Sequence, residues 1–217
     1  MLSPVFRLDT PPELGLKAVT FTLHGLDNRH YSAPLLQRLD ELRAAFDPGH
    51  SLTAQHGFLA LRERIDRSPR RFPPSPLALF EQNRRHGRLR SIAPLVDLYN
   101  QWSLNSGLSI GAHDLQRVRV PVRLTLTRGG ESFHGLGSAE CGALPPGEYA
   151  YIDAAERVLC HLEYRQAAAS ALQEHSSGVL FIVQGHAQTP IHYLRSVADG
   201  LKADLQACCT RELRRAG

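Results

Sequence analysis

The 217-residue sequence lacks the long apolar runs of membrane proteins. Its longest apolar run, residues 179–183, has the length of a strand, whereas a membrane-spanning helix needs about 18 consecutive apolar residues. The N-terminal residues also lack the apolar stretch of a secretory signal peptide. We therefore expect a cytoplasmic protein that has no membrane partner.

Paired cysteines are missing as well. Cys141, Cys160, Cys208 and Cys209 contain no Cys-x-x-Cys spacing, and the adjacent Cys208 and Cys209 point to different sides of any regular element. This arrangement disfavours a zinc site or a disulfide framework and favours buried, reduced thiols. We expect neither a metal nor another cofactor.

Lysine is scarce in this sequence. Of the 25 basic residues only Lys17 and Lys202 are lysines, so 23 are arginines. The codon usage of a GC-rich genome would produce this imbalance. Binding to phosphate or carboxylate groups would also favour it, because the planar guanidinium donates two parallel hydrogen bonds and is weakly hydrated.

The positions of the arginines indicate a local basic segment. Residues 62–90 hold nine arginines against three acidic residues, a charge of +6, so the rest of this chain of net charge +4 sums to −2. A solvated helix face is one explanation. A surface for the phosphate backbone of RNA is the other, and the lack of matching acids favours it.

Two hydrophobic periods predict the secondary structure. Apolar residues three and four apart indicate helices, and alternation indicates strands. The expected helices cover residues 32–46, 75–87, 94–106 and 189–205, and the expected strands cover residues 19–23, 120–127, 148–153, 157–164 and 179–184. Helices that precede most of the strands are typical of an α+β fold, here as one compact unit over residues 1–217.

Polar side chains gather in residues 91–115. Asp97 and Asn100 lie three apart in the expected helix 94–106 and can share a face, with Tyr99 beside them. A turn at 107–109 and the small residues before His113 follow. The pattern indicates a polar, sterically open corner. A helix cap and a buried, hydrogen-bonded histidine are the alternative interpretation.

Short motifs follow one another in a distinctive order. They are SIAPLVDLYN at 91–100, SL at 103–104, SIGAHD at 109–114, GGESF at 129–133, PGE at 146–148, VLC at 158–160 and YRQ at 164–166. This order resembles the B3/B4 domain over about residues 25–210. That domain is the editing module in the beta subunit of bacterial phenylalanyl-tRNA synthetase, and it also occurs as free-standing small proteins. The resemblance implies a mixed β-sheet or barrel-like core flanked by helices, and removal of wrongly attached amino acids from tRNA.

The resemblance also implies which residues form the site. It places the catalytic roles on Asn100 in the helix and His113 in the following loop, and we expect Tyr99 and Asp114 to be further contacts. A substrate turn falls on Glu163 and Tyr164. Gln184 falls near the position of a synthetase glutamate, and Ser109 replaces the usual proline. Because an amide cannot pair ionically with an ammonium group, these departures bear on the substrate more than on the fold.

The expected reaction is hydrolysis of the ester between an amino acid and the terminal ribose. The ester is already activated, so positioning a water molecule can suffice. The resemblance implies that the neighbouring ribose hydroxyl helps to activate this water. The sequence has neither a Gly-x-Ser-x-Gly nor a His-Glu-x-x-His motif, which argues against a serine or zinc hydrolase.

The resemblance leaves two substrate classes, tyrosine on phenylalanine tRNA and canavanine on arginine tRNA. A cationic side chain would need a carboxylate, for which Glu163 is the favoured candidate beside Asp153 and Glu140. Tyrosine would need a neutral hydrogen-bond partner and an aromatic wall.

A free-standing editing protein must hold the tRNA acceptor end by itself. We expect the basic segment to do so, through Arg70, Arg71, Arg84, Arg85, Arg88 and Arg90. A non-catalytic tRNA- or RNA-binding module with the same fold is the main alternative function, and an unrelated small-molecule hydrolase is a third.

Charge reversal of Arg84 and Arg85 tests the basic segment. It is expected to weaken tRNA binding and to flatten the dependence of the affinity on salt, because fewer counterions are then released from the RNA. Titrations of tRNA at several salt concentrations measure both quantities. An unchanged affinity and slope would identify the segment as a solvated face.

Overall fold

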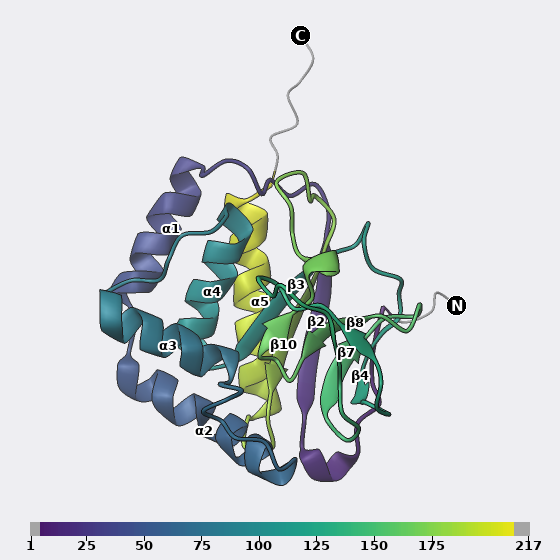
Figure 1. Ribbon diagram of the computed structural model, residues 1–217. Coiled ribbons are helices and arrows are strands. Elements are labelled where there is room, and N and C mark those ends of the chain that lie inside the picture. Colours follow the sequence, from purple (N-terminus) through teal and green to yellow (C-terminus); the bar gives the residue numbers. More distant parts are fainter. Residues whose placement is uncertain (1–4, 211–217) are drawn as a thin grey trace.

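Helices and two β-sheets are stacked in three layers (Figure 1). The computed structural model describes residues 5–210. The α-helices are α1 (Ala33–Ala44), α2 (Pro48–Arg64), α3 (Ser75–His86), α4 (Pro94–Ser106) and α5 (Ile191–Cys208). The strands are β1 (Phe6–Leu8), β2 (Lys17–Leu23), β3 (Ser109–Asp114), β4 (Val122–Leu126), β5 (Ser132–Phe133), β6 (Gly142–Ala143), β7 (Tyr149–Ile152), β8 (Val158–His161), β9 (Arg165–Gln166) and β10 (Val179–Gly185).

Local signals explain where most helices begin and end. The Ser32 hydroxyl accepts a hydrogen bond from the backbone N–H of Leu35 and caps α1. Gly87 and Gly107 adopt left-handed conformations just after α3 and α4, where a side chain would be strained. The expected helices are confirmed in kind and place, with shifts of a few residues at their ends.

The helix α2 has no counterpart in the sequence prediction. The side it buries carries Ser51, Gln55 and Gly57 beside Phe58 and Leu61, so it shows no regular apolar stripe. At Gly57 a Cβ atom would lie 2.0 Å from Nδ1 of His186, so a small residue is required there. Close packing, not hydrophobic periodicity, therefore fixes this helix.

The strands form two main sheets and a small hairpin. The three-stranded sheet has the order β2-β10-β3 and is antiparallel. The five-stranded sheet has the order β1-β4-β7-β8-β9; it is mixed, because β1 runs parallel to β4. The described strands do not close into a barrel, so of the expected core the mixed sheet is confirmed and the barrel is not.

The central strand β10 separates two hydrophobic cores. Val179, Phe181 and Val183 pack with α1, α4 and α5 on one side of the sheet. Leu180 and Ile182 pack on the other side, against the five-stranded sheet and α2. Because successive side chains point to opposite faces, an unbroken apolar run serves both cores at once.

Residues 109–114 form strand β3 and not the expected open loop. Gly111 is paired with Ile182, and His113 with Leu180, in the antiparallel ladder. Small residues and a histidine give this segment little intrinsic strand character. Pairing with β10 supplies the structure that the local sequence does not indicate.

All four cysteines are free thiols. Cys209 is buried as expected, and burial raises the pKa of its thiol to about 12. Cys160 and Cys208 are partly exposed, and Cys141 is exposed, so the expectation of buried thiols is wrong for Cys141.

A buried ion pair joins α2 to the five-stranded sheet. Arg62 is 0 % exposed, and its Nη2 atom donates to Oε1 of Glu163 and to the carbonyl of Leu162, both at 2.5 Å. The same guanidinium donates to the hydroxyl of Tyr149 and to the carbonyl of Phe72. Arg62 therefore lies in the core and does not belong to the basic surface.

This guanidinium also holds a strained turn. Leu162 and Glu163, between β8 and β9, have φ angles of 54° and 44°. Such left-handed conformations are costly for residues with a Cβ atom and persist only where the surroundings hold them. Hydrogen bonds from Arg62 to both residues of the turn provide that support.

Removal of Arg62 tests this anchor. Arg62→Met leaves a buried carboxylate without its counter-ion and is expected to lower the free energy of unfolding by about 3–5 kcal/mol. Urea denaturation measures the change. The double substitution Arg62→Met with Glu163→Gln is expected to recover part of the loss, because burial already raises the pKa of Glu163 and favours a neutral group there.

Arg64→Met is the matched control, since Arg64 is exposed on the same helix. It is expected to change stability by less than about 0.5 kcal/mol. Equal costs for the substitutions at Arg62 and Arg64 would contradict the anchoring role.

Candidate functional site

A small cavity of about 150 Å³ lies where α4, the three-stranded sheet and the five-stranded sheet meet. Its walls are formed by residues from both sheets, from α4 and from the start of α3. They are Ser75, Tyr99, Asn100, Ser109, Ile110, Gly111, His113, Tyr151, Cys160, Glu163, Tyr164, Arg165, Gln166 and Ile182. The structure thus brings together Tyr99, Asn100, His113, Glu163 and Tyr164 from the predicted site.

The strand β3 explains why His113 faces this cavity. Residues 109, 111 and 113 alternate with Ile110 and Ala112, which pack in the helical core. Gly111 lies between the two polar residues, and a Cβ atom built on it would have no atom within 4 Å. The missing side chain of Gly111 therefore leaves space in the cavity next to His113.

The buried ring of His113 is held from one side. Its Nδ1 atom lies 3.0 Å from the hydroxyl of Ser170 and 3.2 Å from Nε2 of Gln166. The same Nε2 of Gln166 donates to the carbonyl of Ala112 at 2.7 Å, which fixes the orientation of the amide. Nδ1 therefore accepts a hydrogen bond, and this assigns the proton of the neutral ring to Nε2.

Burial keeps this histidine neutral. It lowers the pKa of His113 to about 4. At neutral pH the ring is thus a hydrogen-bond donor through Nε2 and not a cation. It can orient an ester or a water molecule without bringing a charge into the cavity.

The helix α4 brings Tyr99 and Asn100 to the cavity. Tyr99 is 8 % exposed, and burial together with the nearby Asp97 raises the pKa of its hydroxyl. Asn100 is half-buried. Within residues 5–210, neither the Tyr99 hydroxyl nor the Asn100 amide has a hydrogen-bond partner, so both are available to a ligand.

The carboxylate of Glu163 is already occupied. Its Oε1 atom is paired with Arg62, and its Oε2 atom accepts a hydrogen bond from Gln184 at 3.3 Å. Gln184 also accepts from the hydroxyl of Tyr151 and lies beneath the cavity, fully buried. These residues form the base of the site and leave no unpaired negative charge in it.

Asp114 does not line the cavity. It lies on the opposite face of β3 from His113, where it accepts hydrogen bonds from the Ser176 hydroxyl and the backbone N–H of Gln116. These contacts stabilise the chain after the strand. Asp153, another candidate partner for a cationic substrate side chain, is bound by Arg157 and by the N–H groups of its own turn.

Sequence reasoning did not assign site roles to Ser75, Tyr151, Gln166 and Ser170. Gln166 could have been found from the sequence, because it belongs to the YRQ motif at 164–166. The hydroxyl of Ser75 lies 2.9 Å from that of Ser109, and it reaches the site because α3 begins there. No pattern in the sequence indicates that Ser170 contacts His113.

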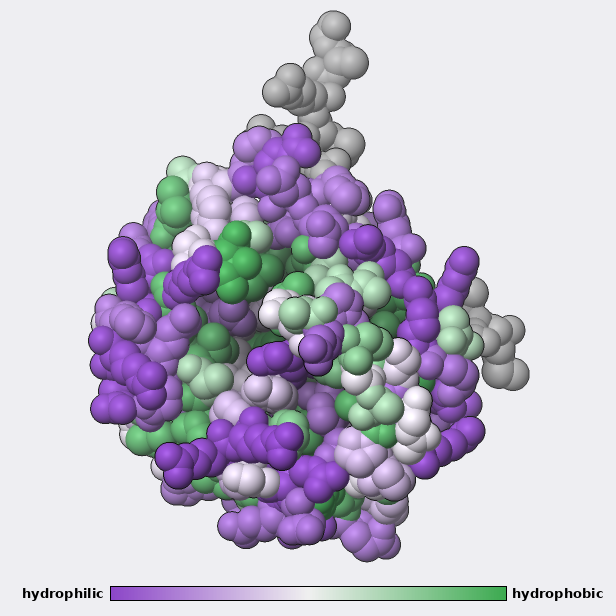
Figure 2. Space-filling view, viewed as in Figure 1, coloured by the Kyte–Doolittle hydropathy of each residue, from purple (hydrophilic) through white to green (hydrophobic). Residues whose placement is uncertain are grey.

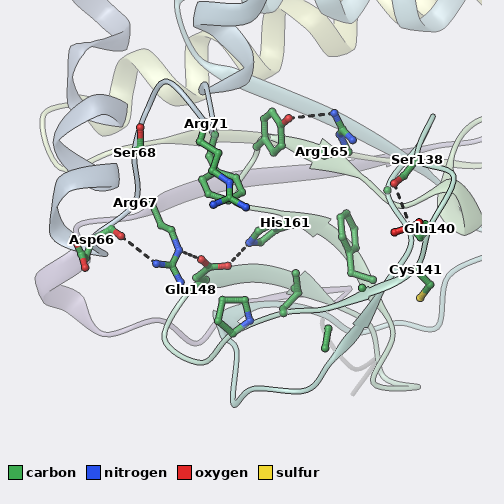
Figure 3. A pocket seen from close by; sticks show the side chains of 18 residues that line it. Asp66, Arg67, Ser68, Arg71, Ser138, Glu140, Cys141, Glu148, His161 and Arg165 are labelled. Carbon is green, nitrogen blue, oxygen red and sulfur yellow. Dashed lines mark hydrogen bonds and ion pairs between the residues drawn. The ribbon is translucent and has the colours of Figure 1, made fainter.

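A larger pocket of about 760 Å³ adjoins the cavity. Tyr164 and Arg165 line both spaces. Figure 3 shows the network on its floor, in which the buried Glu148 accepts from Arg67 and from His161. Figure 2 shows that this face of the molecule is hollowed near its centre, with both hydrophobic and hydrophilic side chains around the opening.

The six arginines expected to bind tRNA are all exposed, but they lie in two places. Arg70 and Arg71 belong to the loop between α2 and α3, and Arg71 lines the larger pocket. The other four, Arg84, Arg85, Arg88 and Arg90, lie at the far end of α3 or just after it, and Glu81 pairs with two of them. With a rise of about 1.5 Å per residue, Arg85 lies about 15 Å along α3 from Ser75.

In residues 5–210 no three His, Cys, Asp or Glu side chains are grouped as a metal site would require. The helices of this range also include none that is both long and apolar enough to cross a bilayer.

Comparisons with known proteins agree with the architecture. The model of the B3/4 domain family matches residues 61–212. A crystal structure of an N-terminal fragment of the phenylalanyl-tRNA synthetase beta subunit from Pyrococcus horikoshii is similar in fold, with a TM-score of 0.51 and 14% sequence identity. The similarity covers 93% of this chain and 49% of that fragment, so the chain spans about half its length. None of the curated proteins matches the sequence.

The pKa of His113 predicts an acid-sensitive stability. The unfolded chain takes up a proton at this histidine near pH 6.5, whereas the folded protein does so only near pH 4. Stability is therefore lost as the pH falls through this window, by up to about 3 kcal/mol from this group. His113→Gln is expected to show a smaller loss in urea denaturation between pH 6.5 and pH 4.

The exposed His192 supplies the control. His192→Gln is expected to retain the acid profile of the unsubstituted protein. Burial also lowers the pKa values of His161 and His186, but both residues are present in every variant, so the difference isolates His113. The same loss of stability in His113→Gln would refute the buried neutral state.

Proposed function

Because the chain belongs to the B3/4 domain family, we propose that it hydrolyses the ester between a wrong amino acid and the 3′ end of a tRNA charged by another enzyme. The observation that carries this proposal is the cavity in which the Asn100 amide and the neutral His113 ring meet. The structural neighbour is a fragment of a tRNA synthetase, which supports tRNA as the partner.

The cavity offers hydrogen bonds where ester hydrolysis develops charge. The Asn100 amide and the Nε2–H of His113 are donors that a carbonyl oxygen or a water molecule can use. Donors held in place before the reaction stabilise the negative charge that grows on the carbonyl oxygen. The ester is intrinsically reactive, so holding it against a water molecule supplies much of the remaining acceleration. The adjacent ribose hydroxyl is the proposed aid to water activation.

The charge balance of the cavity favours a neutral substrate side chain. Among residues 5–210, Glu163 is the one acidic residue that lines the cavity, and Arg62 already neutralises it. A guanidinium-bearing amino acid such as canavanine would have to displace a fully buried arginine. Tyr99, Tyr151 and Ser109 provide an aromatic wall and hydroxyl partners, as a tyrosine side chain requires. We therefore favour tyrosyl-tRNA(Phe) over canavanyl-tRNA(Arg) as the type of substrate.

Deacylation kinetics test the roles of Asn100 and His113. Asn100→Ala and His113→Ala are each expected to lower the deacylation rate by roughly 100-fold, the usual effect of losing one donor to a developing oxyanion. The measurement is loss of radiolabelled amino acid from mischarged tRNA. Asn83→Ala and His192→Gln, which change the same residue types away from the cavity, are expected to keep the full rate.

Full activity in both cavity variants would refute this assignment. Binding of tRNA without deacylation of any mischarged tRNA would instead support the non-catalytic binding module. Hydrolysis of simple esters that RNA does not influence would support the small-molecule hydrolase.

A substrate panel tests the preference for a neutral side chain. The protein is expected to deacylate tyrosyl-tRNA(Phe) at least 10-fold faster than canavanyl-tRNA(Arg), because the cavity wall holds no free carboxylate. Correctly charged phenylalanyl-tRNA(Phe) and arginyl-tRNA(Arg) are the controls. Faster release of canavanine would contradict the charge argument and would return Glu163 to the role of substrate carboxylate.

A further inference from the structure

We propose that the larger pocket binds the unpaired nucleotides at the 3′ end of an RNA and delivers the terminal ribose to the smaller cavity. This inference rests on the proposed function, because it assigns a place to the part of the tRNA that carries the ester. It goes beyond that function by separating two sites: one for the amino acid and one for the nucleotides.

The two spaces share a wall. Tyr164 and Arg165 line both of them, and the side chains of these residues are packed together. The Arg165 guanidinium carbon lies 5.1 Å from the centre of the Tyr164 ring, and its Nη2 atom donates to the Tyr164 hydroxyl at 3.1 Å. A ligand in the larger pocket is therefore separated from the cavity by the thickness of one residue.

Two guanidinium groups in the larger pocket are available to phosphate. Arg67 is engaged by the buried Glu148, but Arg71 and Arg165 form no ion pair within residues 5–210. Each lies over an aromatic ring, Phe72 and Tyr164 respectively, which orients the planar group without neutralising it. A guanidinium held in this way is well suited to bidentate contact with a phosphate.

Acidic residues are present as well, but they lie at the sides of the pocket. Figure 3 shows Asp66 on one side and Glu140 on the other, with Arg71 and Arg165 between them. The third carboxylate, Glu148, is buried on the floor and is bound by Arg67 and His161. The two unpaired guanidinium groups therefore lie between the acidic side chains, and one of them, Arg165, also borders the cavity.

Aromatic side chains line the same pocket. The partly exposed Phe72 and Tyr164 stand at 90° to one another, 5.7 Å apart. Phe133 also lines the pocket and makes an edge contact with His161. Proteins bind single-stranded nucleic acids with this combination of partly exposed rings and unpaired guanidinium groups. The bases stack on the rings, and the phosphates lie near the arginines. The volume of about 760 Å³ falls in the usual range of ligand sites.

The arginines at the far end of α3 have a different place in this arrangement. They are about 15 Å along the helix from the cavity, too far to touch the terminal nucleotides. If they bind tRNA, they contact the backbone further from its 3′ end. Binding of a short RNA and binding of whole tRNA should therefore depend on different arginines.

Calorimetric titration of the full chain with the RNA trinucleotide CCA, the sequence at the 3′ end of tRNA, tests the inference. The double variant Arg71→Gln/Arg165→Gln is expected to bind CCA at least 10-fold more weakly than the unsubstituted protein. Two lost phosphate contacts should also reduce the slope of log affinity against log salt by about 1.4. Tyr164→Leu is expected to weaken binding with the salt slope unchanged.

Arg84→Gln/Arg85→Gln is the matched control, with two arginines replaced at the far end of α3. It is expected to bind CCA within twofold of the unsubstituted protein. The inference is overturned if the unsubstituted protein does not bind CCA, if the Arg71/Arg165 variant binds it equally well, or if the control variant loses binding. Thermal melting shows that each variant is folded before it is compared.

The outcome is separable from that of the proposed function. CCA binding that requires Arg71 and Arg165, in a protein that deacylates no tRNA, would refute the enzyme and support the nucleotide pocket. Deacylation that requires Asn100 and His113, with CCA binding that ignores Arg71 and Arg165, would support the enzyme and overturn the pocket.

Discussion

One fully buried guanidinium, that of Arg62, joins the helix α2 to the five-stranded sheet. Arg62 leaves water completely, and such burial of a charge is tolerated only with a counter-ion and a full set of hydrogen-bond acceptors. Its partners are Glu163, Leu162, Tyr149 and Phe72, which come from the five-stranded sheet and from the loop before α3. Residues of this loop line the larger pocket, and Glu163 and Tyr164 of the β8–β9 turn line the cavity, so one side chain fixes walls of each.

Neutral hydrogen-bonding groups line the cavity, whereas unpaired positive charges lie in the larger pocket. In the cavity the histidine is neutral, the carboxylate is neutralised and the free groups are an amide and a hydroxyl. Unpaired guanidinium groups begin at Arg165, on the boundary, and continue into the larger pocket with Arg71. An aminoacyl ester at the end of a polyanion has the same division, with a compact, reactive group next to a chain of phosphates. The fold matches it through a single shared wall.

Much of the fold could be predicted from sequence, because its signals are local. Ser32, Gly87 and Gly107 mark helix ends, and the apolar run 179–183 marks the central strand. The elements that the sequence does not predict are those whose structure depends on residues distant in the sequence. The strand β3 exists through its ladder with β10, and α2 through the close approach of His186 to Gly57.

The candidate site divides in the same way. Motifs placed Asn100 and His113 in one region, and both do line the cavity. Composition could not show that one arginine of the basic segment is buried, nor that Glu163 is its partner, because the two are 101 residues apart. Asp114, expected as a further contact of the site, lies away from the cavity because neighbouring residues of a strand point to opposite faces.

The pairing of Arg62 with Glu163 has a consequence for how such a pocket can change during evolution. Glu163 lines the cavity, but its charge is paired with Arg62, which does not. The carboxylate is therefore not available to a ligand. A neutral residue at position 62 would leave Glu163 without its counter-ion, and burial, which already raises the pKa of this carboxyl, would favour its neutral form until a cation enters the cavity. A cationic amino acid could then supply the missing counter-ion, and its binding would be coupled to the stability of the fold. Under the proposed function, a change from neutral to cationic side chains would therefore involve position 62, which does not line the cavity.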